Sequence, residues 1–343
     1  MFHSSREPKA PAYMSDASRP RTNDSVRPLP GRIFSLRPSL KSVVWGGTDI
    51  LHLKGLDFPE GTIGESWELS DIPGHRTVVV GGPDHGLTIA QLIEKYGEGL
   101  LGKRSVELFG MEMPLLVKII DARQNLSVQV HPDEDLAQRV HGCHGKTEMW
   151  YVLKSEPEAR IYAGLKEKIT SDDFRRSVED ETLMEVVASS HPEPADVYFL
   201  PAGRVHAIGA GNLLVEIQQA SDITYRVFDY GRGRELHVDR AIDAIDFDTI
   251  LPDYRTAYDK SARIATIVDC PYFRVERRKI DASADLVFSG DSFTIAVCVE
   301  GRCIAETSGR MTALEPGRTI LIPASIPSVR LLGHATLLTA SIP

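Results

Sequence analysis

The sequence predicts a mostly β fold in which two related β-barrels follow one another, with a few helical insertions. Short segments of alternating polarity, separated by glycine and proline turns, dominate the chain after about residue 195. Helix signals occur in only a few stretches, and one strand-rich segment recurs late in the chain. Together these three observations favour a duplicated β unit.

The internal repeat relates residues 193–206 to residues 315–328 without a gap. Both copies open with Glu-Pro, share a later proline, and have the same apolar alternation between the two prolines. A shorter echo relates residues 151–153 to residues 297–299. The alternative is that Glu-Pro turns before apolar strands are simply common. We interpret the match as a repeat and therefore expect two related barrels.

The strand signals in the first half come from short alternating or apolar segments. Residues 65–70 and 126–131 alternate between polar and apolar side chains, which is typical of half-buried strands. Residues 114–120 form a mostly apolar run that contains one lysine, and we expect a buried strand there.

Three segments have helix signals. Residues 87–101 place apolar side chains on one broad face, while residues 133–140 and 171–188 read as shorter helical insertions. The candidate N-caps are Thr88, Asp133 and, for the third segment, Ser171 or Asp172.

The length of 343 residues predicts about two domains. Residues 1–30 are rich in proline, serine and arginine and poor in aliphatic side chains, so we expect a disordered tail there. We expect residues 31–255 to form a first, catalytic domain that carries the helical insertions. Residues 256–343 should form a second β domain that lacks a metal site.

The charge and composition restrict the class of partner. A net charge of −9 argues against a nucleic-acid partner, which usually requires a basic face. No apolar run approaches the roughly 18 residues that a membrane span requires, and the N-terminus shows no secretory signal. Four cysteines without a Cys-x-x-Cys pair fit a reducing cytoplasm. We expect a cytoplasmic monomer or homodimer that acts on a small molecule.

Four residues, Gln129, His131, Glu148 and His206, are the candidate ligands of one divalent metal ion. Gln129 and His131 are two positions apart in a predicted strand, so their side chains point to the same face. Nitrogen and oxygen donors without a thiolate suit zinc and several other divalent metals, and an open position would admit substrate. In the repeat alignment His206 corresponds to Ser328, so we expect a metal site in the first copy alone.

A second group of possible ligands is His141-Gly142-Cys143-His144. It contains three potential donors but no fourth partner nearby in sequence. We interpret it as a surface loop without a metal.

Three basic residues stand out in an acidic chain: Lys118, Lys146 and Arg226. A guanidinium or ammonium group near the metal could hold a phosphate or stabilise an anionic intermediate. The alternative is that each is a solvated or ion-paired strand residue.

Seven segments, in the same order along the chain, resemble the type I mannose-6-phosphate isomerases, especially their shorter bacterial form. They cover roughly residues 33 to 250 and read GESWELSD, PLLVKII, LSVQVHPDEDLA, GKTEMWYVL, PAGRVHAIG, LLVEIQQASDITYRVFDYGR and RELHVDRAID. The connection at residues 231–233 is shorter than short-form relatives often have.

The resemblance implies two cupin-type (jelly-roll) barrels in tandem and interconversion of mannose 6-phosphate and fructose 6-phosphate. It implies one Zn²⁺ ion per chain, or another divalent metal, on the four candidate ligands. The family's catalytic arginine carries over onto Arg226 and a substrate-handling lysine onto Lys146. Ser127 matches a substrate-side serine, and Lys118 is a further candidate for substrate binding.

An aldose–ketose isomerisation of this kind removes a proton from C2, forms a cis-enediol and returns a proton to C1. The general base is left open among a lysine, a carboxylate and a metal-held hydroxide. Two other functions remain possible from the sequence. One is an isomerase of another sugar, such as an unphosphorylated one, and the other is a cupin that binds a sugar phosphate without turnover.

Overall fold

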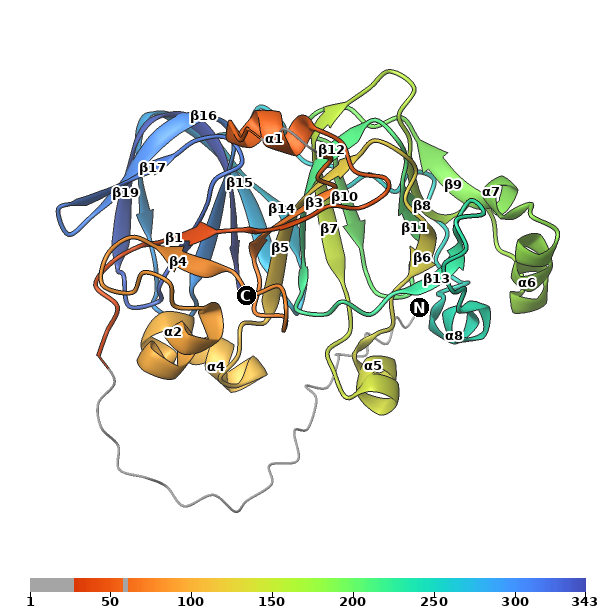
Figure 1. The fold of residues 1–343 in the computed structure, drawn as a ribbon, viewed down its shortest axis with the longest axis horizontal. Coiled ribbons are helices and arrows are strands. Elements are labelled where there is room, and N and C mark those ends of the chain that lie inside the picture. Colours follow the sequence, from red (N-terminus) through yellow and green to blue (C-terminus); the bar gives the residue numbers. More distant parts are fainter. Residues whose placement is uncertain (1–27, 58–60) are drawn as a thin grey trace, which may run out of the picture.

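A computed structural model of the chain describes residues 28–57 and 61–343, so the expected tail at residues 1–30 lies almost wholly outside the described part. The described residues form three antiparallel sheets, and most helices lie at the periphery of these sheets (Figure 1). The mostly β class predicted from the sequence is therefore confirmed.

The three sheets have 8, 6 and 5 strands. The 8-stranded sheet runs β14 (Ile264–Asp269), β15 (Arg274–Val287), β19 (Ser328–Ser341), β16 (Thr294–Thr307), β18 (Thr319–Ile322), β1 (Phe34–Arg37) and β4 (Val78–Val80), with β17 (Arg310–Leu314) paired to β16. The 6-stranded sheet runs β10 (Val197–Leu200), β7 (Glu148–Ser155), β12 (Asn212–Gln219), β5 (Leu115–Ala122), β3 (Glu65–Leu69) and β2 (Ser39–Lys41). The 5-stranded sheet runs β13 (Tyr225–Phe228), β6 (Val128–Val130), β11 (His206–Ile208), β8 (Ile161–Leu165) and β9 (Val187–Ser190).

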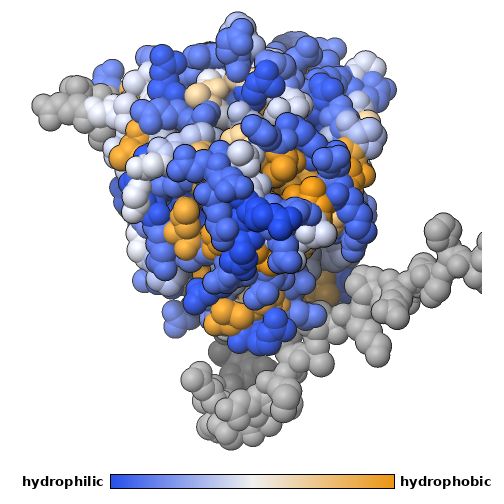
Figure 2. All heavy atoms as spheres, turned by 90° about the vertical axis from the view of Figure 1, so that its right-hand side faces the viewer, coloured by the Kyte–Doolittle hydropathy of each residue, from blue (hydrophilic) through white to orange (hydrophobic). Residues whose placement is uncertain are grey.

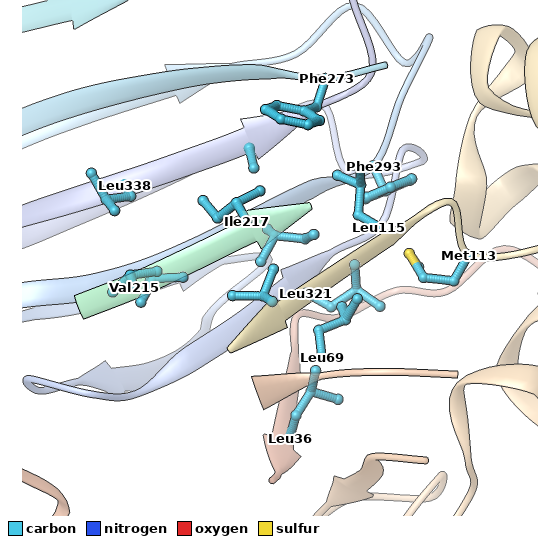
Figure 3. Packing of buried hydrophobic residues seen from close by; sticks show 14 of the residues in the cluster. Leu36, Leu69, Met113, Leu115, Val215, Ile217, Phe273, Phe293, Leu321 and Leu338 are labelled. Atoms are coloured by element: carbon cyan, nitrogen blue, oxygen red, sulfur yellow. The ribbon is translucent and has the colours of Figure 1, made fainter. Parts of the chain in front are cut away.

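The 6-stranded sheet packs on both of its faces, and strand β12 shows how. Successive side chains of a strand point to opposite faces. Val215 and Ile217 belong to the hydrophobic cluster shared with the 8-stranded sheet (Figure 3). Leu214 points the other way, into a cluster shared with the 5-stranded sheet. Because both faces are covered, every residue of β12 is buried.

The predicted repeat is supported by strand pairing. Strand β10 pairs with β7 so that Val197 lies opposite Tyr151. Strand β18 pairs with β16 so that Thr319 lies opposite Val297. Both repeat alignments proposed from the sequence match these positions, so the two halves reproduce one strand pair in the same register.

The repeat also shows what the second copy lacks. Glu148 opens β7, and the corresponding position at the start of β16 is Thr294. His206 opens β11, and its counterpart Ser328 opens β19. Two candidate metal ligands are therefore replaced by hydroxyl side chains in the C-terminal half.

The helices of the described residues are short, and α2, α5 and α6 have side-chain N-caps. They are α1 (Asp49–Lys54), α2 (Ile89–Tyr96), α3 (Glu98–Leu101), α4 (Lys103–Phe109), α5 (Glu134–His141), α6 (Ser171–Glu179), α7 (Leu183–Val186) and α8 (Val238–Ala244). Two predicted N-caps are confirmed: Thr88 accepts the Gln91 backbone N–H in a capping box, and Asp133 accepts the backbone N–H of Leu136. The helical stretch predicted at residues 87–101 is interrupted at Gly97, whose φ is +53°.

The third helix prediction was wrong in its cap and its end. Thr170, rather than Ser171 or Asp172, caps α6, because Thr170 and Asp173 form a capping box. Helix α7 ends at Val186, and residues 187–190 form strand β9. Pairing of β9 with β8 takes the last two residues of the predicted helix into the 5-stranded sheet.

Strands from both halves of the chain share the 8-stranded sheet. Strand β1 pairs with β18 on one side and with β4 on the other. Residues 31–255 and 256–343 therefore contribute to one sheet, although residues 264–341 supply most of its strands. The boundary at residues 255 and 256 stays a prediction.

The end of the molecule that carries α6, α7 and α8 is largely hydrophilic, with small separate hydrophobic areas (Figure 2). The apolar side chains of these helices instead pack into a cluster with the 5-stranded sheet. None of the helices in the described part of the chain has the length and apolarity needed to span a bilayer.

The cluster between the 8-stranded and 6-stranded sheets predicts a stability effect. Phe293 is fully buried there, so we expect Phe293→Ala to lower the free energy of unfolding by about 3–5 kcal/mol. Urea unfolding followed by circular dichroism measures this change. Met311→Ala, at a side chain that is 67% exposed, is the control and should change stability by less than about 0.5 kcal/mol. Equal effects of the two substitutions would contradict the packing described.

Candidate metal centre and active site

The four candidate ligands come together inside the space between the 6-stranded and 5-stranded sheets. Nε2 of His206 lies 3.1 Å from Nε2 of His131 and 3.3 Å from Nε2 of Gln129. The Glu148 carboxylate completes the group, with Oε2 3.4 Å from His131 Nε2 and Oε1 3.3 Å from His206 Nε2. His131, Glu148 and His206 are buried.

Strand pairing explains how residues far apart in sequence meet. His206 lies directly opposite Gln129 where β11 pairs with β6, and Arg226 lies opposite Gln129 where β13 pairs with β6. Glu148 comes from the facing sheet, at the first position of β7. Val128 and Val130 alternate with Gln129 and pack into the opposite cluster, as the period of a strand requires.

The hydrogen bonds of the imidazoles show which nitrogens face the centre. His131 Nδ1 lies 2.9 Å from the Ile223 carbonyl and His206 Nδ1 lies 2.8 Å from the Arg204 carbonyl. A carbonyl accepts, so each Nδ1 carries the proton and each Nε2 presents a lone pair to the centre. This arrangement is typical of metal-ligating histidines, whose outer nitrogen donates to a backbone or carboxylate oxygen.

Lone pairs of two imidazoles and of the Glu148 carboxylate converge on the centre. Neither carboxylate oxygen of Glu148 forms a hydrogen bond, although both are buried. Burial, with Lys146 nearby, lowers the pKa of His131 to about 3, and burial also lowers the pKa of His206. Burial opposes ionisation of Glu148, yet the Lys146 ammonium holds its pKa well below the usual value. Neutral imidazoles around an ionised carboxylate fit a divalent cation.

Gln129 completes the donor set. Rotation of its terminal amide by half a turn exchanges Oε1 and Nε2, so the side chain can present an oxygen to a cation. Among residues 28–57 and 61–343, His131, Glu148 and His206 are the histidine, cysteine and acidic side chains close enough together to hold an ion.

Two buried lysines lie near Glu148: Lys146 in the segment before β7, and Lys118 on β5. Lys146 Nζ lies 3.1 Å from Glu148 Oε2, and the side chain is buried. Lys118 Nζ lies 2.8 Å from Glu216 Oε1 and also donates to Gln218. Burial opposes the charge on Lys118, but Glu216 raises its pKa above the usual value. The Lys118–Glu216 pair is thus a charged pair on the inner face of the 6-stranded sheet.

Glu216 was missed in the sequence analysis. Its second oxygen accepts from the Trp150 indole at 2.9 Å, so both oxygens are committed. A signal was present: a glutamate within the apolar run 213–217 must be paired if the strand is buried on both faces. Lys118, the lysine within the apolar run at residues 114–120, was the partner that the sequence offered.

Arg226 lies at the other side of the centre, on β13. Its Nε donates to Ser127 Oγ at 3.2 Å. Arg232 and Arg234 also approach, and both pair with the buried carboxylate of Asp229. Burial and the neighbouring Arg234 lower the pKa of Arg226. Three guanidinium groups around one buried carboxylate leave an excess of positive charge on this side.

This arginine cluster (Arg226, Arg232 and Arg234) was only partly anticipated. The sequence analysis treated residues 231–233 as a short connection and named Arg226 alone. Pairing with Asp229 turns the connection back toward β13, which brings the other two arginines near Arg226. Clustered basic residues beside a strand of the candidate site were the missed signal.

The histidines of the segment 141–144 have partners of their own in the structure, and the absence of a metal there stays a prediction. His144 is held between two carboxylates, with Nδ1 2.9 Å from Glu134 Oε1 and Nε2 2.5 Å from Glu112 Oε1. Residues 142–144 form a loop with Gly142 exposed, as expected, but the His144 side chain is only 14% exposed. The ion pairs with Glu112 and Glu134 give the segment a structural role.

Comparisons with known proteins identify the family of this chain. Residues 33–161 match the family described as phosphomannose isomerase type I, catalytic domain, and residues 263–342 match the mannose-6-phosphate isomerase cupin domain. The mannose-6-phosphate isomerase ManA of Bacillus subtilis is 34% identical over 313 residues, which cover 87% of this chain and 95% of that protein. The putative mannose-6-phosphate isomerase YvyI of the same organism is 32% identical over 318 residues, 90% of this chain and 98% of that protein.

A solved structure gives the same result for the fold. The mannose 6-phosphate isomerase from Bacillus subtilis superimposes with a TM-score of 0.81 at 29% identity, covering 90% of this chain and 99% of that one. The predicted cupin fold is confirmed by the domain matches and by this likeness. The chain belongs to the type I mannose-6-phosphate isomerase family.

Proposed function

We propose that the protein is a metal-dependent aldose–ketose isomerase that interconverts mannose 6-phosphate and fructose 6-phosphate through a cis-enediol. The observation that carries the proposal is the buried Glu148 carboxylate, which faces two imidazole lone pairs and has no hydrogen bond. A cation site with basic side chains on both sides suits a reaction in which negative charge develops on sugar oxygens. Membership of the isomerase family supports the choice of substrate.

Zn²⁺ is the proposed ion, held by Gln129, His131, Glu148 and His206. Two imidazoles with oxygen donors suit zinc, and other divalent metals can use the same donors. When bound, the ion supplies a Lewis acid that stabilises negative charge on the substrate oxygens. The hydroxyl residues Thr294 and Ser328 replace two ligands in the second copy, which supports one ion per chain.

The basic side chains have different proposed roles. Lys146 adjoins Glu148, so we assign it to the reacting carbons, where it can hold or move a proton. Arg226, supported by Ser127, faces the same space and would stabilise the enediolate. The excess charge of the arginine cluster suits the substrate phosphate. Lys118 stays a proposed substrate contact, with its ammonium held in place by Glu216.

The cellular setting is proposed on less direct grounds. The four cysteines are unpaired, which supports a reducing cytoplasm. A small sugar phosphate is the proposed partner, and we propose a monomer or homodimer. The catalytic domain is assigned to residues 31–255, and residues 256–343 form the β domain without a metal site.

Two other functions are separable by experiment. An isomerase of unphosphorylated mannose would turn over mannose faster than mannose 6-phosphate, whereas the arginine cluster favours the phosphorylated sugar. A binding protein would bind mannose 6-phosphate without producing fructose 6-phosphate. A coupled assay on both sugars, with and without chelator, tests the proposal, and turnover unaffected by complete metal removal would overturn it.

His206→Ala tests the metal site. Loss of one imidazole from a site without a spare donor should reduce the bound metal to below about a tenth of the wild-type content after dialysis. Inductively coupled plasma mass spectrometry measures metal per chain independently of activity. His191→Ala, at a histidine bonded to the Ala159 carbonyl, is the control and should keep its metal. Full metal content in His206→Ala would refute the assignment of His206 as a metal ligand.

Arg226→Ala tests the proposed transition-state role. The guanidinium lies outside the donor set, so we expect wild-type metal content and a fall in kcat of about 10²–10³-fold. Steady-state kinetics together with metal analysis separate the two effects. Arg175→Ala, at a surface arginine paired with Asp239, is the matched control. An unchanged kcat in Arg226→Ala would remove this residue from the mechanism.

A further inference from the structure

Glu134, in the first turn of α5, is a hub for donors from the segment that precedes β7 and from the end of β12. Its Oε1 accepts from His144 Nδ1 at 2.9 Å. Its Oε2 accepts from the backbone N–H of Gly145 and from Nε2 of Gln219, each at 3.0 Å. The Glu134 side chain is only 15% exposed. All three donors belong to segments next to the candidate metal centre.

These contacts hold the backbone on both sides of Lys146. Glu134 binds Gly145 directly before it, and Gln219 Oε1 accepts the N–H of Thr147 directly after it at 2.9 Å. The N–H of Lys146 itself donates to the Pro132 carbonyl at 3.1 Å. The helix start and the lysine segment therefore form one bonded unit.

Gly145 allows this close approach. A Cβ atom at this position would lie 2.6 Å from the backbone nitrogen of Glu134, so a side chain cannot fit without moving the helix start. The segment thus lies directly against α5 instead of being held by side chains alone.

His144 supplies the opposite charge for the hub. Its imidazole bridges Glu134 and the more exposed Glu112, and these two carboxylates raise the pKa of His144 to about 10. Burial opposes ionisation of Glu134, yet the bonds from His144 and Gly145 lower its pKa. The hub is therefore an ion pair at neutral pH.

We propose that Glu134 is a positioning residue for Lys146, with His144 as its countercharge. The inference rests on the proposed role of Lys146 in the isomerase reaction. Lys146 has to place its ammonium beside Glu148, 3.1 Å away, and its own side chain has no other fixed partner in the described part of the chain. The backbone on either side of the lysine must then set its place, and the hub bonds directly to one neighbour and through Gln219 to the other.

Glu134→Gln tests the hub with little change in size. One acceptor oxygen becomes an NH₂ group that faces N–H donors, so the segment has to move. A displacement of about 1 Å at a catalytic group can cost about 10²-fold, and we expect kcat to fall by about 10–100-fold with metal content unchanged. Asp135→Asn is the control, since it removes the same charge from the exposed neighbour on the same turn and should change kcat less than about twofold.

A double-mutant cycle with Lys146→Met separates positioning from general destabilisation. If Glu134 acts through Lys146, Glu134→Gln will lower kcat by less than about twofold when Lys146 is already Met. Additive losses in the double variant, or a wild-type kcat in Glu134→Gln alone, would overturn the inference. A wild-type kcat in the Lys146→Met variant would instead refute the proposed role of Lys146.

The position of Lys146 in a crystal structure tests the inference independently of enzyme activity. In a crystal structure of Glu134→Gln we expect residues 143–147 to be displaced, with Lys146 Nζ no longer within 4 Å of Glu148 Oε2, whereas Asp135→Asn should keep the wild-type distance. An unchanged lysine position in Glu134→Gln would overturn the inference even if no isomerase activity were found. His144→Lys, which restores a positive charge, should recover more kcat than His144→Leu if the countercharge matters.

Discussion

A buried carboxylate without a hydrogen bond is the constraint on which the site depends. Removing an ionised carboxylate from water costs several kcal/mol unless opposite charge or donors replace the water. Glu148 lies between two neutral imidazoles that offer lone pairs instead of protons, and Lys146 is its charged neighbour. This arrangement becomes favourable when a cation accepts the converging lone pairs.

The scaffold holds this electron-rich group in a fixed geometry. Carbonyls of Ile223 and Arg204 set the orientation of the two imidazole rings, and strand pairing sets the distance between them. The facing 6-stranded sheet supplies Glu148, at the first position of β7. Ligands borne on paired strands are placed more accurately than ligands on loops, because the ladder hydrogen bonds restrict both neighbours.

The duplicated half contributes support instead of chemistry. It repeats the strand pair that carries Glu148, in the same register, but has Thr294 at the corresponding position. Its hydrophobic face covers one side of β12, the strand that carries Glu216 on the other side. Strands β1 and β4 join the N-terminal part of the chain to the same sheet. The C-terminal half thus covers one face of the sheet that carries Glu148 and Glu216.

The sequence by itself determined the local features of this protein. Strand alternation placed Gln129 and His131 on one face, Thr88 and Asp133 marked two helix starts, and the repeat indicated two related barrels with one set of ligands. Family resemblance connected Glu148 and His206 to the same centre, which periodicity alone could not do. Each of these features depends on neighbours within a few positions or on a recognisable string.

The tertiary structure decided the pairings between distant charges. Lys118 finds Glu216 98 positions later, and His144 finds Glu112 32 positions earlier. The choice of partner depends on which strands become neighbours and which side chains lose water, and neither is encoded in local spacing. For that reason the chemistry of single ligands could be expected from the sequence, whereas the charge balance that places Lys146 and the arginine cluster could not.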